Sequence, residues 1–269
     1  MIDLRGASAE ALAALTDELP ATGDAAVSAT LAEDLSGVAT TLRTEGALRR
    51  FATDQSVPAQ ARQGLVGDVF GGKVGAEALD VVRSAAGKRW TAPRDLPDAL
   101  EHLSVVATVR SAGDDAGRLA DELFAYAQAV KDNPPLRDAL SDPARSQADK
   151  AALVERLLGS RALPATVTLA TQSLSGTYRT VGAALEAYQR TAAEVQGRRV
   201  ATVRAARPLT DDETRRLSDV LSQQYGRAVQ LNLVVDPSLL GGVRVEIGDD
   251  VIDGTVASRL DDARRRLAG

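Results

Sequence analysis

The sequence has no cysteine, and this absence removes several kinds of chemistry at once. A chain of 269 residues without a thiol forms no disulfide, no thiolate zinc site and no cysteine nucleophile. Aromatic residues make up only 3% of the chain, so we do not expect surfaces that stack bases or sugars on aromatic rings. The lack of cysteine is consistent with a cytosolic protein.

Long apolar runs and an excess of basic charge are also missing. No stretch approaches the ~20 apolar residues needed to span a bilayer, and the first segment carries acidic residues where a secretory signal would have an apolar centre. The formal net charge is −5, with both signs mixed along the chain. We therefore expect no nucleic-acid partner and only indirect contact with a membrane, through another protein.

Hydrophobic residues make up 44% of the chain and recur at helical spacing from residue 8 to about 195. Glycine, proline and Ser-Asp pairs separate the helical segments. The pattern predicts helices at about 8–20, 26–44, 46–53, 58–70, 75–88, 96–130, 135–141, 146–158, 162–175 and 178–197. The helices at 46–53 and 135–141 have the weakest pattern.

Two parts of this helical region resemble each other at an offset of 88 residues. "LAEDLSGVATTLRTEGALRRFATD" from Leu31 corresponds to "LADELFAYAQAVKDNPPLRDALSD" from Leu119, and 10 of 56 aligned positions are identical between 31–86 and 119–174. The same offset aligns Ala11, Leu12 and Leu15 with Ala99, Leu100 and Leu103. We interpret this as two copies of one helical bundle, about 8–95 and 96–197. The alternative is coincidental leucine periodicity.

The period changes after residue 197. The stretches 198–206 and 228–236 and the run "GGVRVEIG" alternate as half-buried strands do, and "VID" follows a Gly-Asp-Asp turn. Between the first two strands, Thr210 and Glu213 form a capping-box pattern at the start of a helix, and Gly226 suits its end. A last helix is predicted at about 254–268. The fold class is therefore mainly α: two tandem helical bundles, 1–95 and 96–197, followed by a small α+β C-terminal domain, 198–269.

Two motifs resemble binding sites, one for phosphate and one for a metal ion, and the spacing of their residues argues against both. "GDVFGGKV" begins like a phosphate-binding loop, but Val74 stands where Ser or Thr must hold magnesium, and a helix precedes it. We therefore interpret it as the end of a helix. The aspartates of "DPSLLGGVRVEIGDDVIDGTVASRL" could suggest a metal site, but the spacing matches no standard loop. Turn and cap roles explain Asp236 and Asp253.

No catalytic constellation is found elsewhere in the sequence. His102 is the only histidine and has no second ligand of its kind. Trp90 and its repeat counterpart Tyr178 are expected to anchor bundle cores. We expect no catalytic residue, no metal and no cofactor.

The C-terminal stretch "VDPSLLGGVRVEIGDDVIDGTVASRLDDARRRL" resembles the C-terminal pattern of the delta subunit of F-type ATP synthases, the counterpart of the mitochondrial oligomycin-sensitivity-conferring protein. The matching pattern is Asp-Pro-x-Leu-x-Gly-Gly, alternating Val and Ile, a Gly-Asp turn, then Asp-Gly-Thr. Upstream, the segment from Leu119 to about 158 resembles the family's N-terminal bundle. The resemblance covers about 96–269, and the repeat explains the excess as a duplicated bundle in an extended delta subunit.

The resemblance implies a non-catalytic stator subunit. In the family, the bundle binds N-terminal helices of the alpha subunits on the catalytic head, and the C-terminal domain binds the b-type peripheral stalk. The head is thereby kept from rotating during proton-driven ATP synthesis. It also implies a peripheral location at the cytoplasmic face of the cell membrane. Either bundle copy could meet the head.

Interface residues are predicted in two regions. In the second bundle, the groove candidates could instead fill the core. The two predicted interface sets are Leu100, Leu103, Val106, Tyr178 and Val181 for the head, and Leu239, Leu240, Val243 and Ile252 for the stalk. Structural turn and cap roles are predicted for Gly241, Gly242, Gly248, Asp253 and Gly254.

Two rival hypotheses remain from other classes of protein. One is a free-standing helical scaffold or adaptor, for which the C-terminal match would be accidental. The other is a metal-dependent phosphohydrolase that uses Asp236, Asp249 and Asp253. Co-purification with head and stalk subunits separates the first rival, and metal titration separates the second.

Overall fold

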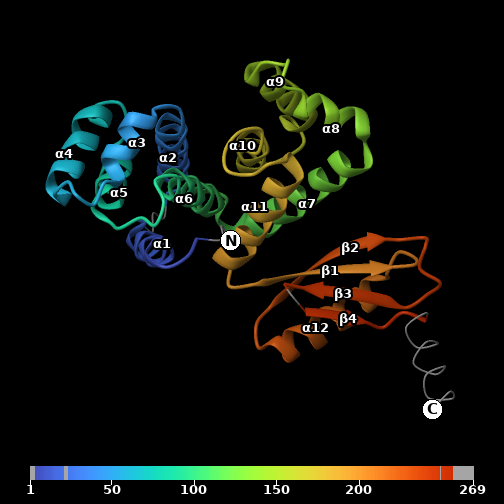
Figure 1. Ribbon diagram of the computed structural model, residues 1–269. Coiled ribbons are helices and arrows are strands. Elements are labelled where there is room, and N and C mark those ends of the chain that lie inside the picture. The colour runs from blue at the N-terminus through green and yellow to red at the C-terminus, as the bar shows by residue number, and fades with distance from the viewer. Residues whose placement is uncertain (1–3, 21–23, 249, 257–269) are drawn as a thin grey trace, which may run out of the picture. The chain divides into compact units, whose positions relative to one another are not determined.

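The computed structural model describes residues 4–20, 24–248 and 250–256. The chain folds into two compact units, Met1–Ala192 and Ala193–Gly269. The first unit is helical and the second contains a four-stranded sheet with a helix (Figure 1). The fold class predicted from the sequence, mainly α with a small α+β C-terminal domain, is confirmed. The helix predicted at 254–268 lies almost wholly outside the described residues.

The helices of the first unit follow the predicted order closely. They are α1 (Ala7–Glu18), α2 (Ala25–Thr44), α3 (Gly46–Thr53), α4 (Ala59–Phe70), α5 (Ala76–Gly87), α6 (Asp95–Ser111), α7 (Ala116–Asp132), α8 (Pro134–Ser141), α9 (Gln147–Leu158), α10 (Pro164–Gln172) and α11 (Val181–Val195). Both short helices with the weakest sequence pattern, α3 and α8, are present.

One prediction in this region is wrong. The sequence pattern indicated a single helix over 96–130, but the chain breaks it into α6 and α7. Gly113 has a φ of 52°, which is outside the helical region and accessible to glycine at little cost. A short 3-10 turn, Gly113–Asp115, then leads into α7. The Gly-Asp-Asp sequence carried this signal, but the continuous apolar periodicity on both sides obscured it.

The helix boundaries repeat at the offset of 88 residues. The bounds of α8 and α9 equal those of α3 and α4 with 88 added, and the start of α10 equals that of α5 with 88 added. On this numbering α6 is the sixth helix of the first repeat and also the first helix of the second. The predicted boundary at residue 95, which assigns α6 to the second copy alone, stays a prediction.

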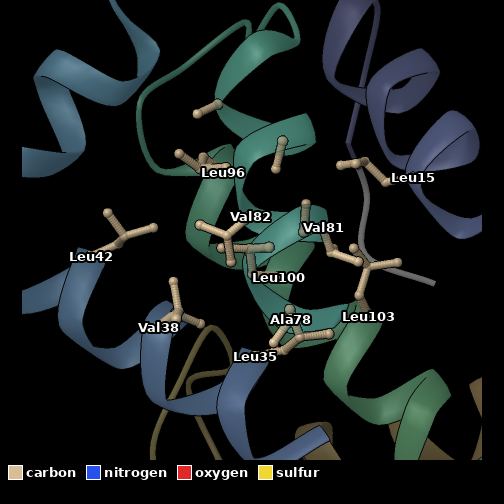
Figure 2. Close-up of a cluster of buried hydrophobic side chains, with 14 of the residues drawn as sticks. Leu15, Leu35, Val38, Leu42, Ala78, Val81, Val82, Leu96, Leu100 and Leu103 are labelled. Atoms are coloured by element: carbon tan, nitrogen blue, oxygen red, sulfur yellow. The ribbon is translucent and has the colours of Figure 1, made fainter. Parts of the chain in front are cut away.

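Two hydrophobic clusters fill the first unit, and α6 contributes to both. The first cluster joins the helices α1 to α6, with Leu35, Val82 and Leu100 near its centre (Figure 2). The second cluster joins the end of α6 to α7, α10 and α11, and Val105 and Val109 are its members from α6. One helix therefore gives successive faces to two cores.

The second unit is a mixed sheet with one covering helix. Its elements are β1 (Arg199–Ala205), α12 (Asp211–Tyr225), β2 (Val229–Val235), β3 (Val243–Ile247) and β4 (Asp250–Asp253). The strand order is β2-β1-β3-β4; β1 and β2 are parallel, and the other pairs are antiparallel. The parallel pair needs a crossover, which α12 provides.

The start of α12 has the predicted capping box. Thr210 Oγ1 accepts a hydrogen bond from Glu213 N at 3.3 Å, and Glu213 Oε2 accepts one from Thr210 N at 2.9 Å. Arg207 donates to the same carboxylate at 2.6 Å, and this contact, with the Thr210 backbone bond, lowers the pKa of Glu213 to about 2. Gly226 ends the helix with a φ of 65°. Buried Leu221 on α12 and Val203 and Val245 on the strands form the third cluster.

Candidate partner-binding surfaces

Two aspartates of the C-terminal stretch are held by local hydrogen bonds. Asp236 Oδ1 accepts from Ser238 N at 3.0 Å and from Ser238 Oγ at 2.6 Å. Asp253 Oδ1 accepts from Thr255 N at 3.0 Å and from Thr255 Oγ1 at 2.7 Å, and these bonds lower the pKa of Asp253. Asp249 lies outside the described residues. Within the described ranges, no group of three His, Asp or Glu side chains is placed to hold a metal ion.

The glycines of this stretch allow two backbone segments to approach closely. Gly242 has a φ of 82°, and a Cβ placed there would lie 2.4 Å from the carbonyl oxygen of Gly254. Gly254 N donates to Val243 O at 2.9 Å, and Val256 N donates to Gly241 O at 3.0 Å. The chain after β4 is thus fixed against the start of β3. Gly248, with a φ of 59°, occupies the turn between β3 and β4.

The residues predicted to line a head-binding groove do not lie together on one surface. Leu100 and Leu103 are 0% exposed and lie in the first cluster (Figure 2). Val106 is 2% exposed and belongs to the same cluster. Tyr178 and Val181 pack on the second cluster. There the ring of Tyr178 contacts the ring of Tyr188 edge-on, with 5.8 Å between the two ring centroids. The three α6 side chains are core in this structure because they pack in the first cluster with side chains of α1, α2 and α5.

The predicted stalk-binding residues are more accessible. Leu240 is 81% exposed and Ile252 is 38% exposed, whereas Leu239 and Val243 are partly buried. Other apolar side chains of this unit are also exposed, and the sequence analysis did not single them out. They are Val195, Val220, Leu233, Val235, Val251 and Val256. Strand alternation places Leu233 and Val235 on the same face as buried Val229, so the pattern predicts burial for two side chains that are exposed in the structure.

Two clefts lie among the described residues of the helical unit, and the sequence analysis missed both. The larger, about 430 Å³, lies between α2, the end of α6 and the start of α10. The smaller, about 310 Å³, lies between α2 and the start of α5. Their walls are mostly apolar and small, with acidic Glu33 and Asp115 at the larger cleft and Asp34 and Glu77 at the smaller one.

One wall of the larger cleft, the start of α10, is equivalent to one wall of the smaller cleft, the start of α5. Leu163, Pro164 and Ala165 at the larger cleft correspond, at the 88-residue offset, to Gly75, Ala76 and Glu77 at the smaller one. Both clefts use the amino-terminal half of α2, on different faces of that helix. The sequence signal was the alanine-rich start of α2, where small side chains leave space between helices.

Fold and surfaces together define a class of protein. It is a helical-repeat protein with a small α+β domain, and its described surface offers apolar clefts and exposed apolar side chains. No helix in the described part of the chain has the length and apolar character to cross a membrane.

The comparisons then identify the family. Residues 104–267 match the model of the family described as ATP synthase delta (OSCP) subunit. ATP synthase subunit delta of a Nocardioides species is 58% identical over 99% of this chain and 98% of its own. The Streptomyces avermitilis protein of the same name is 42% identical over 98% of each chain. The chain belongs to the ATP synthase delta (OSCP) subunit family.

Membership of this family establishes the general function of the chain. This family is a structural component of the ATP synthase, so the chain is a non-catalytic peripheral-stalk subunit of a membrane-bound complex. Among solved structures, a chain of the Toxoplasma gondii mitochondrial ATP synthase hexamer aligns with 57% of this chain and 97% of its own, at 21% identity and a TM-score of 0.33. That similarity is too low to support a structural argument.

Proposed function

We propose that this subunit links the catalytic head to the b-type stalk, with the helical unit bound to the head and the α+β unit bound to the stalk. The observation that carries this proposal is the division into two compact units, each with its own hydrophobic core and its own exposed apolar surface. A linker needs two separate binding ends, and two moderate interfaces hold an assembly more strongly than either does alone. The location that follows is the cytoplasmic face of the membrane, reached only through the complex.

The head-binding partner in this proposal is the N-terminal helices of the alpha subunits. An amphipathic helix binds by placing apolar side chains in a groove, and both clefts offer small apolar walls for such side chains. Their acidic residues would favour basic side chains beside the apolar face of the helix. We therefore place the head-binding groove at the clefts beside α2 and no longer along the apolar stripe of α6.

Arginine substitutions along α2 test this assignment. Ala29 lines the larger cleft and Thr30 the smaller one, while Thr40 is an exposed residue of the same helix outside both clefts. Each Arg variant is mixed with the catalytic head and separated on a sizing column. Loss of co-elution with Ala29→Arg or Thr30→Arg, but not with the matched control Thr40→Arg, identifies the cleft in use.

Removal of the alpha-subunit N-terminal helices provides the second arm of that experiment. The proposal requires co-elution with the intact head and loss of co-elution with the truncated head. Co-elution that survives both truncation and all three Arg variants would contradict binding through these clefts.

The stalk-binding surface in this proposal centres on the turn before β3. Leu240 is the most exposed large apolar residue of the described chain, and Leu239 and Ile252 extend the apolar surface. Replacing Leu239 and Leu240 with Asp should abolish retention by an immobilised stalk subunit. The charge-matched control replaces exposed Gln223 and Gln224 of α12 with Asp. Retention of the Leu239/Leu240 variant, with the sheet still folded, would contradict the assignment.

Deleting the first repeat is a poor test of its role. Removal of residues 8–95 would expose the buried side chains of Leu100, Leu103 and Val106, which pack against α2 and α5. A loss of function after that deletion would therefore report misfolding as readily as a lost contact. Surface substitutions on α2 avoid this problem.

A further inference from the structure

A buried carboxylate lies where the two helical repeats meet. Glu101 on α6 is 2% exposed. Its Oε1 accepts a hydrogen bond from Tyr188 OH of α11 at 2.8 Å, and its Oε2 accepts one from the backbone N of Thr177 at 3.0 Å. A buried carboxylate without such partners would be strongly destabilising. The second repeat thus supplies two of the groups that stabilise this charge.

The first repeat supplies the counter-charge. Arg43, near the end of α2, pairs with Glu101 and also reaches Asp98 Oδ1 at 3.2 Å. The same Nη2 atom lies 2.8 Å from Thr177 Oγ1 in the segment between α10 and α11. The five residues Arg43, Asp98, Glu101, Thr177 and Tyr188 form what we call the junction cluster. It connects α2 of the first repeat to α11 of the second across α6.

The backbone beside Thr177 is shaped to fit the cluster. Gly176 has a φ of 114°, and a Cβ there would lie 2.6 Å from the Glu101 carboxylate oxygens. Only a residue without a side chain allows the segment to approach Glu101 this closely. The Tyr178 ring packs edge-on against Tyr188, so the segment is fixed on both sides of Thr177.

The cluster is not part of the bundle pattern itself. At the 88-residue offset, Glu101, Thr177 and Tyr188 correspond to Ala13, Arg89 and Leu100. The first repeat therefore lacks the Glu101 carboxylate and both hydroxyl groups at the equivalent places, although Asp98 corresponds to Glu10. These polar residues occur where a second repeat follows a first, which indicates a role in joining the two.

We propose that the junction cluster is a conformational lock, which fixes the second repeat against the first and prevents rotation about α6. A single shared helix would otherwise leave the two repeats free to twist at the level of Glu101. The lock also sets the width of the larger cleft, because one wall of that cleft is α2 and the other is α10. Its test does not depend on which partner the clefts bind.

A distance measurement on the full chain tests the lock. Because the chain has no cysteine, spin labels can be placed on Gln60→Cys in α4 and Ala152→Cys in α9, both exposed. Pulsed electron paramagnetic resonance then reports the distance distribution between the repeats. The variants are Arg43→Gln and the milder Thr177→Val, which removes one hydroxyl without leaving a bare charge. The control Lys88→Gln breaks an ion pair with Glu18 inside the first repeat.

If the junction cluster is a lock, the distance between the two labels has one narrow distribution in the labelled chain and in Lys88→Gln. The same distance distribution is broadened in Arg43→Gln and Thr177→Val. Amide hydrogen exchange in α11 should be about tenfold faster in Arg43→Gln. If Arg43→Gln fails to fold, the Thr177→Val distribution decides, since that variant keeps every charge paired. An unchanged narrow distribution in a folded Arg43→Gln, or in Thr177→Val when the first does not fold, would overturn the proposal.

Discussion

The helices α1 and α6 hold the same place in the two repeats, yet their surroundings differ. Four of the 12 residues of α1 are buried, against 13 of the 17 residues of α6. The helix α1 has one neighbouring core, whereas α6 closes the first repeat and opens the second. The comparison teaches that a helix placed between two hydrophobic cores loses the solvent-facing side that its counterpart keeps.

Sharing a helix explains which polar residues α6 contains. Buried Ser104 donates to Glu101 O at 2.7 Å and accepts from Gln172 of α10 at 2.8 Å, and buried Thr108 donates to Ser104 O at 2.9 Å. Each of these hydroxyls is therefore hydrogen-bonded, as buried polar groups must be. A helix buried on nearly every side cannot show the simple amphipathic stripe of a surface helix.

The largest expected effect comes from truncating the shared helix. Leu100→Ala should lower the free energy of unfolding by about 3 kcal/mol, because it leaves a cavity at a fully buried site. If α6 belongs to both repeats, amide exchange should accelerate in α11 as well as in α1. The counterpart Leu12→Ala should accelerate exchange near α1 alone. Hydrogen exchange with mass spectrometry measures both, and unchanged protection of α11 in Leu100→Ala would refute the sharing.

A smaller effect is expected from the single histidine, whose counterpart in the first repeat is Ala14. Burial lowers the pKa of His102 from 6.5 to about 4. The unfolded chain therefore takes up a proton near pH 6.5 while the folded chain does not. Stability from this group is complete above about pH 6.5 and is lost as the pH falls toward 4.

The measurement compares denaturant unfolding at pH 7.5 and pH 5. The unsubstituted chain should lose about 2 kcal/mol more than His102→Gln between these two values. Other titrating groups are common to both chains and cancel in the difference. Equal losses in the two chains would show that His102 is accessible to protons in the folded state.

The smallest expected effects concern helix starts, where the repeats differ again. Ser146 caps α9 by accepting from Asp149 N at 3.1 Å, but its counterpart Pro58 gives α4 no side-chain cap. Ser146→Ala should therefore cost about 1 kcal/mol. Pro58→Ala should lack that cost, because no cap bond is lost. A thermal melt of each variant tests the difference, and equal shifts would contradict the capping account.

Local patterns in the sequence predicted most of the fold. The capping box at Thr210 and the alternation along the strands depend on neighbouring residues, and the offset of 88 residues is a likeness between two stretches of sequence. All three can be recognised without a structure. The break at Gly113 was missed because apolar periodicity continued across it. The burial of Leu100 was left open because it depends on α2, more than 50 residues away.

The candidate binding surfaces were less predictable for the same reason. A cleft exists where side chains from three helices fail to fill a space, and no short stretch of sequence reports that. The junction cluster likewise joins Arg43 to Thr177, which are 134 residues apart. Leu240 was identified because the C-terminal domain has apolar strand faces and only two predicted helices to cover them.

The central claim, that this chain links head to stalk, is tested most directly by a bridging measurement. The stalk subunit is immobilised, and the catalytic head is passed over it with and without this chain. The account predicts that the head is retained only when the full chain is present, and that either the Leu239/Leu240→Asp variant or removal of the alpha-subunit N-terminal helices abolishes retention. Retention of the head without this chain, or no retention with a folded full chain, would contradict the account.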